Sequence, residues 1–171
     1  MAVEPDPPAR RSDQVVLRPA AAEDVPWLLE LAGGYEVEPF LAPGAVQGLA
    51  DSVAAGEAFV AEASDGRAVG AVRAMVVNER SRIGALRSLM IDPAARGRGL
   101  GVAVVRAVTA RLFEEADVHR VEAEVYGFNA GGLKVFELAG FRREGTRRRA
   151  YWRHDGWQDG VTFGLLADER E

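Results

Sequence analysis

The sequence predicts a single mixed α/β domain in which strands and helices form packed layers. A chain of 171 residues lies in the usual size range of one domain. Its 48 % hydrophobic and 27 % charged residues are ordinary for a globular protein and unlike the composition of disordered chains. Segments with the alternating pattern of strands and segments with the helical period follow one another along the chain, which predicts a layered α/β fold.

The first half of the chain predicts a strand, two helices and three further strands. Residues 1–13 are rich in Pro, Asp and Arg, which predicts a flexible tail before the domain. The acidic pair Glu23-Asp24 favours the first turn of a helix. Asp65-Gly66 is typical of a hairpin turn, and Pro93 ends the last strand. The expected elements are a strand at 15–17, helices at 23–33 and 44–55, and strands at 58–61, 68–77 and 85–91.

The second half predicts a long helix, a strand, a short helix and a terminal hairpin. Residues 100–116 carry apolar side chains at helical spacing, and residues 121–126 alternate small apolar residues with Glu and Tyr, as a strand does when one face meets the core. A helix at 131–139 and a hairpin at 141–166 are expected to follow. We therefore expect one domain over residues 14–167 and a C-terminal tail over residues 168–171.

Composition excludes several classes of function. With no cysteine, the chain has no disulfide framework, no thiolate metal site and no covalent cysteine intermediate. The two histidines, His119 and His154, have no further ligand at metal-site spacing, so no metal is expected. The net charge of −5 disfavours a nucleic-acid binder. No apolar stretch reaches membrane-spanning length, so we expect a cytoplasmic protein with no membrane partner.

A glycine-rich segment between a strand and the longest helix is the most informative stretch. It reads Ile-Asp-Pro-Ala-Ala-Arg-Gly-Arg-Gly-Leu-Gly over residues 91–101. Glycines let a ligand approach the backbone, and the unpaired N–H groups that begin a helix attract anions such as a diphosphate. The same glycines could instead form a tight turn that packs closely. A Walker loop and a Rossmann fingerprint are both excluded, because their glycine spacing and residue types are absent.

Arg96-x-x-Gly99-x-Gly101 after a strand ending in Ile91-Asp92-Pro93 resembles the acetyl-CoA signature of the GNAT superfamily, Arg/Gln-x-x-Gly-x-Gly/Ala. The resemblance extends from residue 15 to residue 166, and it includes Asn129 and the segment Phe-Glu-Leu-Ala-Gly-Phe over residues 136–141. Several details are similar to the ribosomal-protein serine/alanine acetyltransferase (RimJ/RimL-like) branch. The resemblance implies the GNAT fold, a mixed central sheet of about six or seven strands flanked by about four helices.

The resemblance also implies how acetyl-CoA, the expected cosubstrate, is bound. Two strands, ending near Ile91 and beginning near Val121, would splay apart to form its slot. Main-chain groups of one strand would pair with the pantetheine arm, loop amides would hold the pyrophosphate, and an asparagine and a phenylalanine would contact the cofactor. The residues implied are Leu89, Met90, Ile91, Arg96, Gly97, Arg98, Gly99, Leu100, Gly101, Val102, Asn129 and Phe136.

The acceptor amine must lose a proton before it attacks. At pH 7, deprotonation costs about 4–5 kcal/mol for an amine with a pKa near 10.4, but only about 1–1.5 kcal/mol for an α-amine. Glu124 lies where a subset of the family has its catalytic glutamate, and Glu122 shares its strand face. Either glutamate could act as the base or could be an exposed partner of an arginine. Tyr35 and Glu36 are the expected acceptor contacts.

The chain departs from the family pattern at Phe136, where many members have a tyrosine that protonates the leaving thiolate. Water, Tyr126, Tyr151 or direct departure of the thiolate could replace that acid. The expected function is N-acetyl transfer from acetyl-CoA to a primary amine, on a protein N-terminus or a small molecule, in a ternary complex. An acyl-CoA-binding sensor or scaffold is the alternative. Trp152 and Trp157 suggest a homodimer interface.

Overall fold

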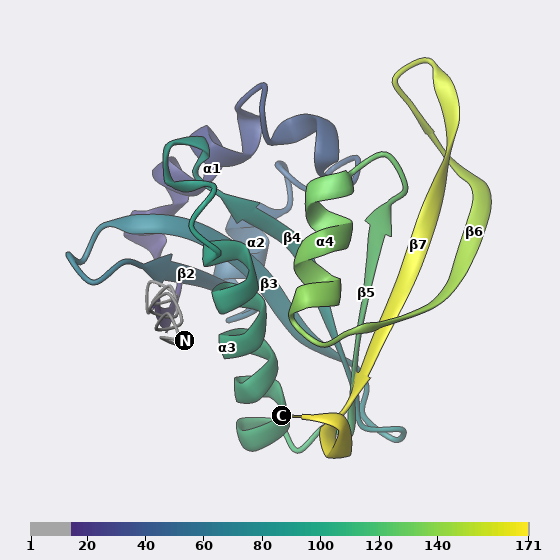
Figure 1. Ribbon diagram of the computed structural model, residues 1–171. Coiled ribbons are helices and arrows are strands. Elements are labelled where there is room, and N and C mark those ends of the chain that lie inside the picture. The colour runs from purple at the N-terminus through teal and green to yellow at the C-terminus, as the bar shows by residue number, and fades with distance from the viewer. Residues whose placement is uncertain (1–14, 171) are drawn as a thin grey trace, which may run out of the picture.

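The computed structural model describes residues 15–170. These residues form a domain built around a seven-stranded mixed sheet (Figure 1). The strand order is β1-β2-β3-β4-β5-β7-β6, and neighbours are antiparallel except for the parallel pair β4–β5. The tail expected over residues 1–13 lies outside the described residues. The strands are β1 Val16–Pro19, β2 Ala58–Glu62, β3 Ala68–Asn78, β4 Ile83–Ile91, β5 Arg120–Tyr126, β6 Arg142–Arg153 and β7 Gly156–Leu166.

Within these residues, four α-helices and four short 3-10 helices join the strands, and the predicted fold class is confirmed. The second helix was predicted over residues 44–55, but the structure limits it to six residues, because Gly44 has a φ of +80° and residues 44–48 form turns. The helices are α1 Val25–Gly33, α2 Leu49–Ala54, α3 Leu100–Glu115, α4 Ala130–Leu138, η1 Ala22–Asp24, η2 Glu38–Phe40, η3 Pro93–Ala95 and η4 Ala167–Glu169.

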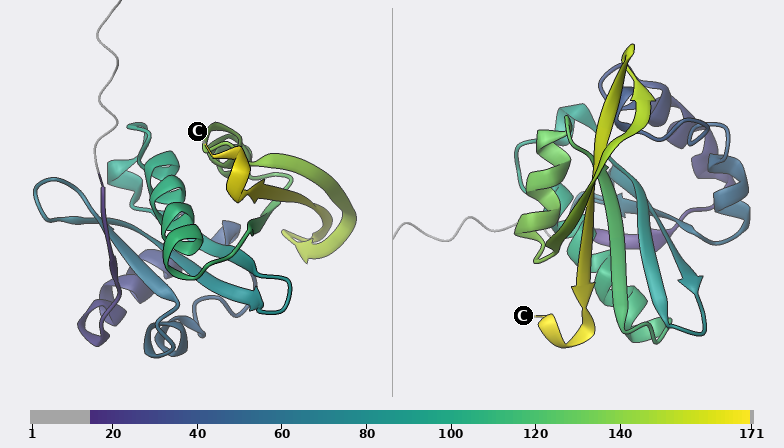
Figure 2. Two further views of the ribbon diagram at one scale, coloured as in Figure 1. Left: turned by 90° about the horizontal axis from the view of Figure 1, so that it is seen from below. Right: turned by 90° about the vertical axis from the view of Figure 1, so that its right-hand side faces the viewer.

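The helices cover both faces of the sheet, two on each (Figure 2). Alternation along the strands explains this arrangement: in β2, Phe59 and Ala61 belong to the core that residues of α3 and α4 share, whereas Val60 belongs to the core that residues of α1 and α2 share. The larger core includes Phe163, which is fully buried. Two apolar faces on one sheet therefore require helices on both sides.

The parallel strands β4 and β5 separate part-way along their length. Their cross-strand pairs run from Ile83–Arg120 to Leu86–Ala123, and beyond this point the strands diverge (Figure 1). β4 has a bulge at the point where the two strands separate. Its register against β3 shifts between Arg87 and Met90, and Ser88 within this stretch has a φ of +50°. The divergence agrees with the splayed strand pair that the resemblance to the GNAT superfamily implied.

The hairpin of β6 and β7 extends beyond the rest of the sheet (Figure 1). Near its turn, Arg153 donates hydrogen bonds to the carbonyl oxygens of Glu38 and Pro39, each at 3.3 Å. Trp152 and Trp157 are both more than half exposed and lie edge-to-face with ring centroids 5.0 Å apart. The hairpin is thus attached to η2, a segment more than a hundred residues earlier in the chain.

Charged side chains hold the C-terminal end of the described chain. η4 begins directly after β7, and Glu169 accepts a hydrogen bond from the Leu166 amide and pairs with Arg142 at 2.8 Å. Arg170 pairs with Glu114 at 2.8 Å.

No helix within residues 15–170 is long and apolar enough to cross a lipid bilayer. In the same residues, no group of three or more His, Cys, Asp or Glu side chains could hold a metal ion.

Candidate active site

A cleft of about 320 Å³ opens where β4 and β5 diverge. Ser88 and Leu89 of β4 line it together with Val125 of β5 and Phe136 of α4. Residues 40–45, from the last residue of η2 towards α2, line it as well. The cleft therefore connects β4 as far as Leu89, the first of the expected cofactor contacts, with the segment in front of α2.

Asn129 lies at the edge of this cleft and begins α4. Its side-chain oxygen accepts a hydrogen bond from the Gly132 amide at 2.9 Å, so it caps the helix. A Cβ atom on Gly132 would lie 2.6 Å from the side-chain nitrogen of Asn129, and this is why glycine is needed there. The cap leaves the amide nitrogen of Asn129 as the group that could donate to a ligand.

The glycine-rich loop leads from β4 to α3 and exposes its backbone. Gly97 and Gly99 have φ values of +82° and +77°, a region that favours glycine, and a Cβ atom on either would meet nothing within 4 Å. Gly99 is the N-cap of the 16-residue helix α3, and no side chain caps the amides of its first turn. Gly101 has another role, because a Cβ atom there would lie 3.0 Å from Val135 of α4. The start of α3 thus has first-turn amides that no N-cap side chain bonds, and open space beside Gly97 and Gly99 that an anion could occupy.

Arg96 connects this loop to the segment that was expected to bind the acceptor. Its guanidinium donates to the main-chain oxygens of Glu36 at 3.0 Å and of Ile91 at 3.3 Å. The Glu36 carboxylate lies 3.9 Å from the same guanidinium. Tyr35 is 86 % exposed and is not among the residues that line the cleft. The structure therefore brings Glu36 to the loop and leaves Tyr35 in solvent.

Glu124 lies on the part of β5 that pairs with β7 but no longer with β4, and it lines the cleft. The hydroxyl of Tyr151 donates to its carboxylate at 2.7 Å. Arg147 donates to the other carboxylate oxygen at 3.2 Å and to the Tyr151 hydroxyl at 2.7 Å. Both partners come from β6, so the terminal hairpin sets the position of the predicted base.

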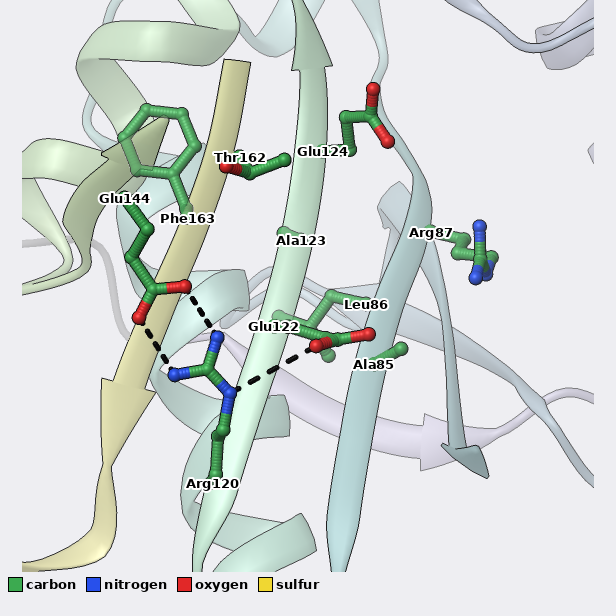
Figure 3. A pocket seen from close by; sticks show the side chains of 10 residues that line it. All are labelled: Ala85, Leu86, Arg87, Arg120, Glu122, Ala123, Glu124, Glu144, Thr162 and Phe163. Atoms are coloured by element: carbon green, nitrogen blue, oxygen red, sulfur yellow. Dashed lines mark hydrogen bonds and ion pairs between the residues drawn. The ribbon is translucent and has the colours of Figure 1, made fainter. Parts of the chain in front are cut away.

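Glu122 lies two residues earlier on the same face, in a second pocket of about 280 Å³ (Figure 3). Its carboxylate is 3.9 Å from Arg120, which forms two hydrogen bonds with Glu144. Glu124 borders both pockets, whereas Glu122 borders only the second. Of the two predicted glutamates, Glu124 is thus the one beside the diverging strands.

Burial and the hydrogen bond to Glu124 raise the pKa of Tyr151 to about 12. Burial likewise raises the pKa of Tyr126, whose hydroxyl is buried and has no hydrogen-bond partner within the described residues. Both tyrosines line the cleft, and their rings meet edge-to-face at 5.3 Å. Both phenols therefore stay protonated at neutral pH and can donate a proton or a hydrogen bond.

A tyrosine titration tests this coupling. We expect the Glu124→Gln variant to lower the pKa of Tyr151 from about 12 towards the ordinary value of about 10, because the variant removes the negative charge that disfavours tyrosinate. Burial remains, so the pKa should stay above that of an exposed tyrosine. Tyrosinate absorbance measured against pH, with Tyr151→Phe to assign the signal, reports the shift. An unchanged Tyr151 pKa in Glu124→Gln would contradict the contact.

Phe136 packs in the core and also borders the cleft. It is 5 % exposed, stacks on Phe163 at 5.6 Å and meets Phe141 edge-to-face at 5.2 Å. This aromatic packing explains why a phenylalanine suits the position. In the absence of a hydroxyl there, Tyr126 and Tyr151 are the phenols of the cleft.

Comparison with known proteins identifies the family. The model of the acetyltransferase (GNAT) family matches residues 27–141, about two thirds of the chain. The chain belongs to the GNAT family of acetyltransferases. The match covers the glycine-rich loop, β4, β5 and α4, so the main elements of the cleft are those of a GNAT protein.

Curated relatives of this GNAT chain match over part of its length. It is 32 % identical over 109 residues to the Bacillus subtilis protein named "Probable N-acetyltransferase YjcK", covering 64 % of this chain and 60 % of the relative. It is 34 % identical over 82 residues to the L-2,4-diaminobutyric acid acetyltransferase of Streptomyces avermitilis, covering 48 % and 46 %. The matches therefore span about half to three fifths of these relatives.

Solved structures support the GNAT fold over most of the chain. A spermidine N-acetyltransferase from Vibrio cholerae, in complex with CoA and spermine, superposes with a TM-score of 0.80 at 18 % identity, covering 91 % of this chain and 97 % of that one. A GNAT-family acetyltransferase from Bacillus anthracis superposes with a TM-score of 0.78 at 16 % identity, covering 91 % and 96 %. At these identities, the likeness establishes the fold.

Some residues of the GNAT cleft could not be identified from the sequence. Arg73 and Arg87 line it from β3 and β4, and residues 40–45 close it, but neither set carries a local motif. The polar side chains Arg73 and Arg87 interrupt otherwise apolar strand runs, and this interruption is the one signal that could have indicated them.

Proposed function

We propose that this chain transfers an acetyl group from acetyl-CoA to the primary amine of a small molecule. The observation that carries the proposal is the separation of β4 and β5 after Leu86 and Ala123, because it opens a cleft that extends from Leu89 of β4 to Glu124 of β5. Acetyl-CoA supplies the thioester whose carbonyl carbon accepts the amine. Family membership supports this chemistry.

The residues present fit acetyl-CoA on two grounds. Beyond the last β4–β5 pair, β4 has no partner strand on its β5 side, so main-chain groups among Leu89, Met90 and Ile91 that point to that side could pair with the pantetheine amides. The loop from Arg96 to Val102 offers amides at an open helix N-terminus, which suits a pyrophosphate. Asn129 and Phe136 border the cleft between these regions.

Proton transfer in the proposed reaction falls to Glu124 and its neighbours. Glu124 takes one proton from the acceptor ammonium, and the neutral nitrogen bonds to the thioester carbon. The nitrogen then gives its second proton to water, and the carbon–sulfur bond breaks. The departing thiolate takes a proton from water or from Tyr151, and Tyr151 would then recover a proton from protonated Glu124. Tyr151 already donates to Glu124, which favours a protonated phenol in the cleft.

The small-molecule acceptor is favoured by the modest size of the cleft, about 320 Å³. Residues 40–45 and Tyr151 of the hairpin border this volume, which matches a small amine better than a folded protein surface. The spermidine and diaminobutyric acid acetyltransferases, with which this chain shares fold or sequence, are named for small amines. A protein N-terminus, as in the RimJ/RimL-like branch, and a homodimer through Trp152 and Trp157 stay predictions from the sequence.

Acetylation assays with purified protein test the proposal. We expect acetyl-CoA to bind, and CoA to be released in proportion to acetylated amine for at least one member of a panel of diamines, polyamines, amino acids and N-terminal peptides. Released CoA is measured by its free thiol and the product by mass. Binding of acetyl-CoA without turnover on any acceptor would instead favour the sensor, an alternative supported by Phe136 at the usual tyrosine position. Failure to bind acetyl-CoA would refute both.

A further inference from the structure

We propose that the acceptor carries a carboxylate as well as its amine, and that Arg87 and Arg73 bind this carboxylate in the cleft. The inference depends on the proposed acetyl transfer and specifies its substrate class as an amino acid or a similar amine with a negative charge. Glu124 would take the amine end, and the two arginines would take the acidic end.

The strand register brings the two arginines together. Arg73 of β3 and Arg87 of β4 are direct cross-strand partners, so their side chains leave the same face of the sheet about 5 Å apart at Cβ. Like charges in such a pair are destabilising. Glu57 neutralises Arg73 through an ion pair at 2.9 Å, whereas the Arg87 side chain forms no hydrogen bond or ion pair within residues 15–170. One positive charge at this position therefore lacks a counter-charge.

Unpaired hydrogen-bonding groups point to the same kind of ligand. The Nε atom of Arg73 and the hydroxyl of Tyr126 are buried and have no partner among the described residues, and both residues line the cleft. Buried polar groups in folded proteins are normally paired, so a ligand atom is the expected partner. Arginine can only donate, and an ionised carboxylate can only accept. A carboxylate could therefore accept hydrogen bonds from the unpaired Arg73 Nε and Tyr126 hydroxyl.

The pyrophosphate of acetyl-CoA does not account for this charge. The glycine-rich loop begins after Ile91, four residues and about 13 Å along the strand from Arg87. The pantetheine arm between these points is uncharged. Arg87 also borders the second pocket together with Glu124, so the two side chains project from neighbouring strands within one continuous region (Figure 3). A compact amino acid can reach both.

Matched pairs of acceptors test the inference. Each pair is an amino acid and the amine left by removing its carboxylate: L-2,4-diaminobutyrate and 1,3-diaminopropane, L-ornithine and putrescine, and L-lysine and cadaverine. We expect kcat/KM to favour the carboxylated member of at least one pair by about 10–100-fold, the effect of a hydrogen bond to a charged group. In Arg87→Gln this ratio should fall towards one. Arg142→Gln, an exposed arginine outside the cleft, should keep the wild-type ratio.

A binding measurement separates this inference from the proposed function. Calorimetry of the same pairs against protein saturated with free CoA reports acceptor binding without turnover. Preferential binding of a carboxylated member that Arg87→Gln abolishes would support the carboxylate site even if no acetylation occurs. Equal binding and equal kcat/KM within every pair would overturn the inference, and so would a preference that Arg87→Gln leaves intact. In either case, acetylation of any amine would still support the proposed function.

Discussion

Replacing Glu124 with glutamine is expected to lower kcat by about 10²–10⁴-fold, the usual contribution of a general base. Glutamine keeps the size of the side chain but cannot accept the proton of an acceptor ammonium. The loss should be greatest for amines with a high pKa, because their deprotonation is the most costly at neutral pH. Steady-state kinetics with a lysine-like amine and an α-amine acceptor would measure both effects.

Two further variants distinguish a catalytic role from a structural one. Arg147→Gln breaks the ion pair with Glu124 but keeps the carboxylate, so kcat should fall much less than in Glu124→Gln. Glu122→Gln tests the second predicted glutamate, which borders only the pocket around Arg120. If Glu122→Gln lowered kcat as much as Glu124→Gln does, the assignment of Glu124 as the single base would be wrong.

Replacing Gly99 with glutamate should weaken acetyl-CoA binding by about 100-fold or more. The new carboxylate would stand at the N-terminus of α3, where the pyrophosphate is proposed to bind. Two like charges about 4 Å apart repel by about 4 kcal/mol near a protein surface. Isothermal titration of wild type and variant with acetyl-CoA measures the loss.

Gly66 supplies a matched control for the Gly99 variant. It has a φ of +80° and open space around its Cβ position, much like Gly99, but it lies in the turn between β2 and β3. Gly66→Glu therefore introduces the same charge and a similar backbone strain of about 1–2 kcal/mol. Its thermal stability should fall about as far while acetyl-CoA binding is kept. Equal loss of binding in both variants would show that strain or net charge, rather than the loop, is responsible.

Local patterns in the sequence predicted most of the fold. Alternation over residues 121–126 and helical spacing over residues 100–116 correspond to β5 and α3 within a residue or two. The second helix was predicted too long, because Val46, Leu49 and Val53 have helical spacing although only the last two lie in α2. Val46 still packs against the same core as Leu49, from a turn. Burial alone therefore did not distinguish helix from turn.

The parts of the candidate site that are continuous in the sequence could be predicted, and the parts that bring distant residues together could not. The glycine-rich loop is one continuous segment, so its spacing could be recognised and its open geometry anticipated. Arg73 and Arg87 become neighbours only through the register of β3 and β4, including the bulge at Ser88. Tyr151 reaches Glu124 through the pairing of β6 with β7 and of β7 with β5. Such contacts depend on the sheet register, which no local motif contains.

The attachment of residues 36–39 also bears on how acceptor preference could change. Arg96 holds the carbonyl oxygen of Glu36, and Arg153 holds those of Glu38 and Pro39, so these anchors rest on the main chain. Substituting side chains in this segment would leave the three anchoring acceptors in place. In the wall of the cleft beyond it, the exposed residues Phe40, Ala42 and Pro43 can therefore be redesigned for a new amine without releasing the segment that supports them. Leu41 and Ala45 belong to the buried core and Gly44 has a positive φ, so libraries directed at the three exposed positions should yield altered specificity more often than loss of fold.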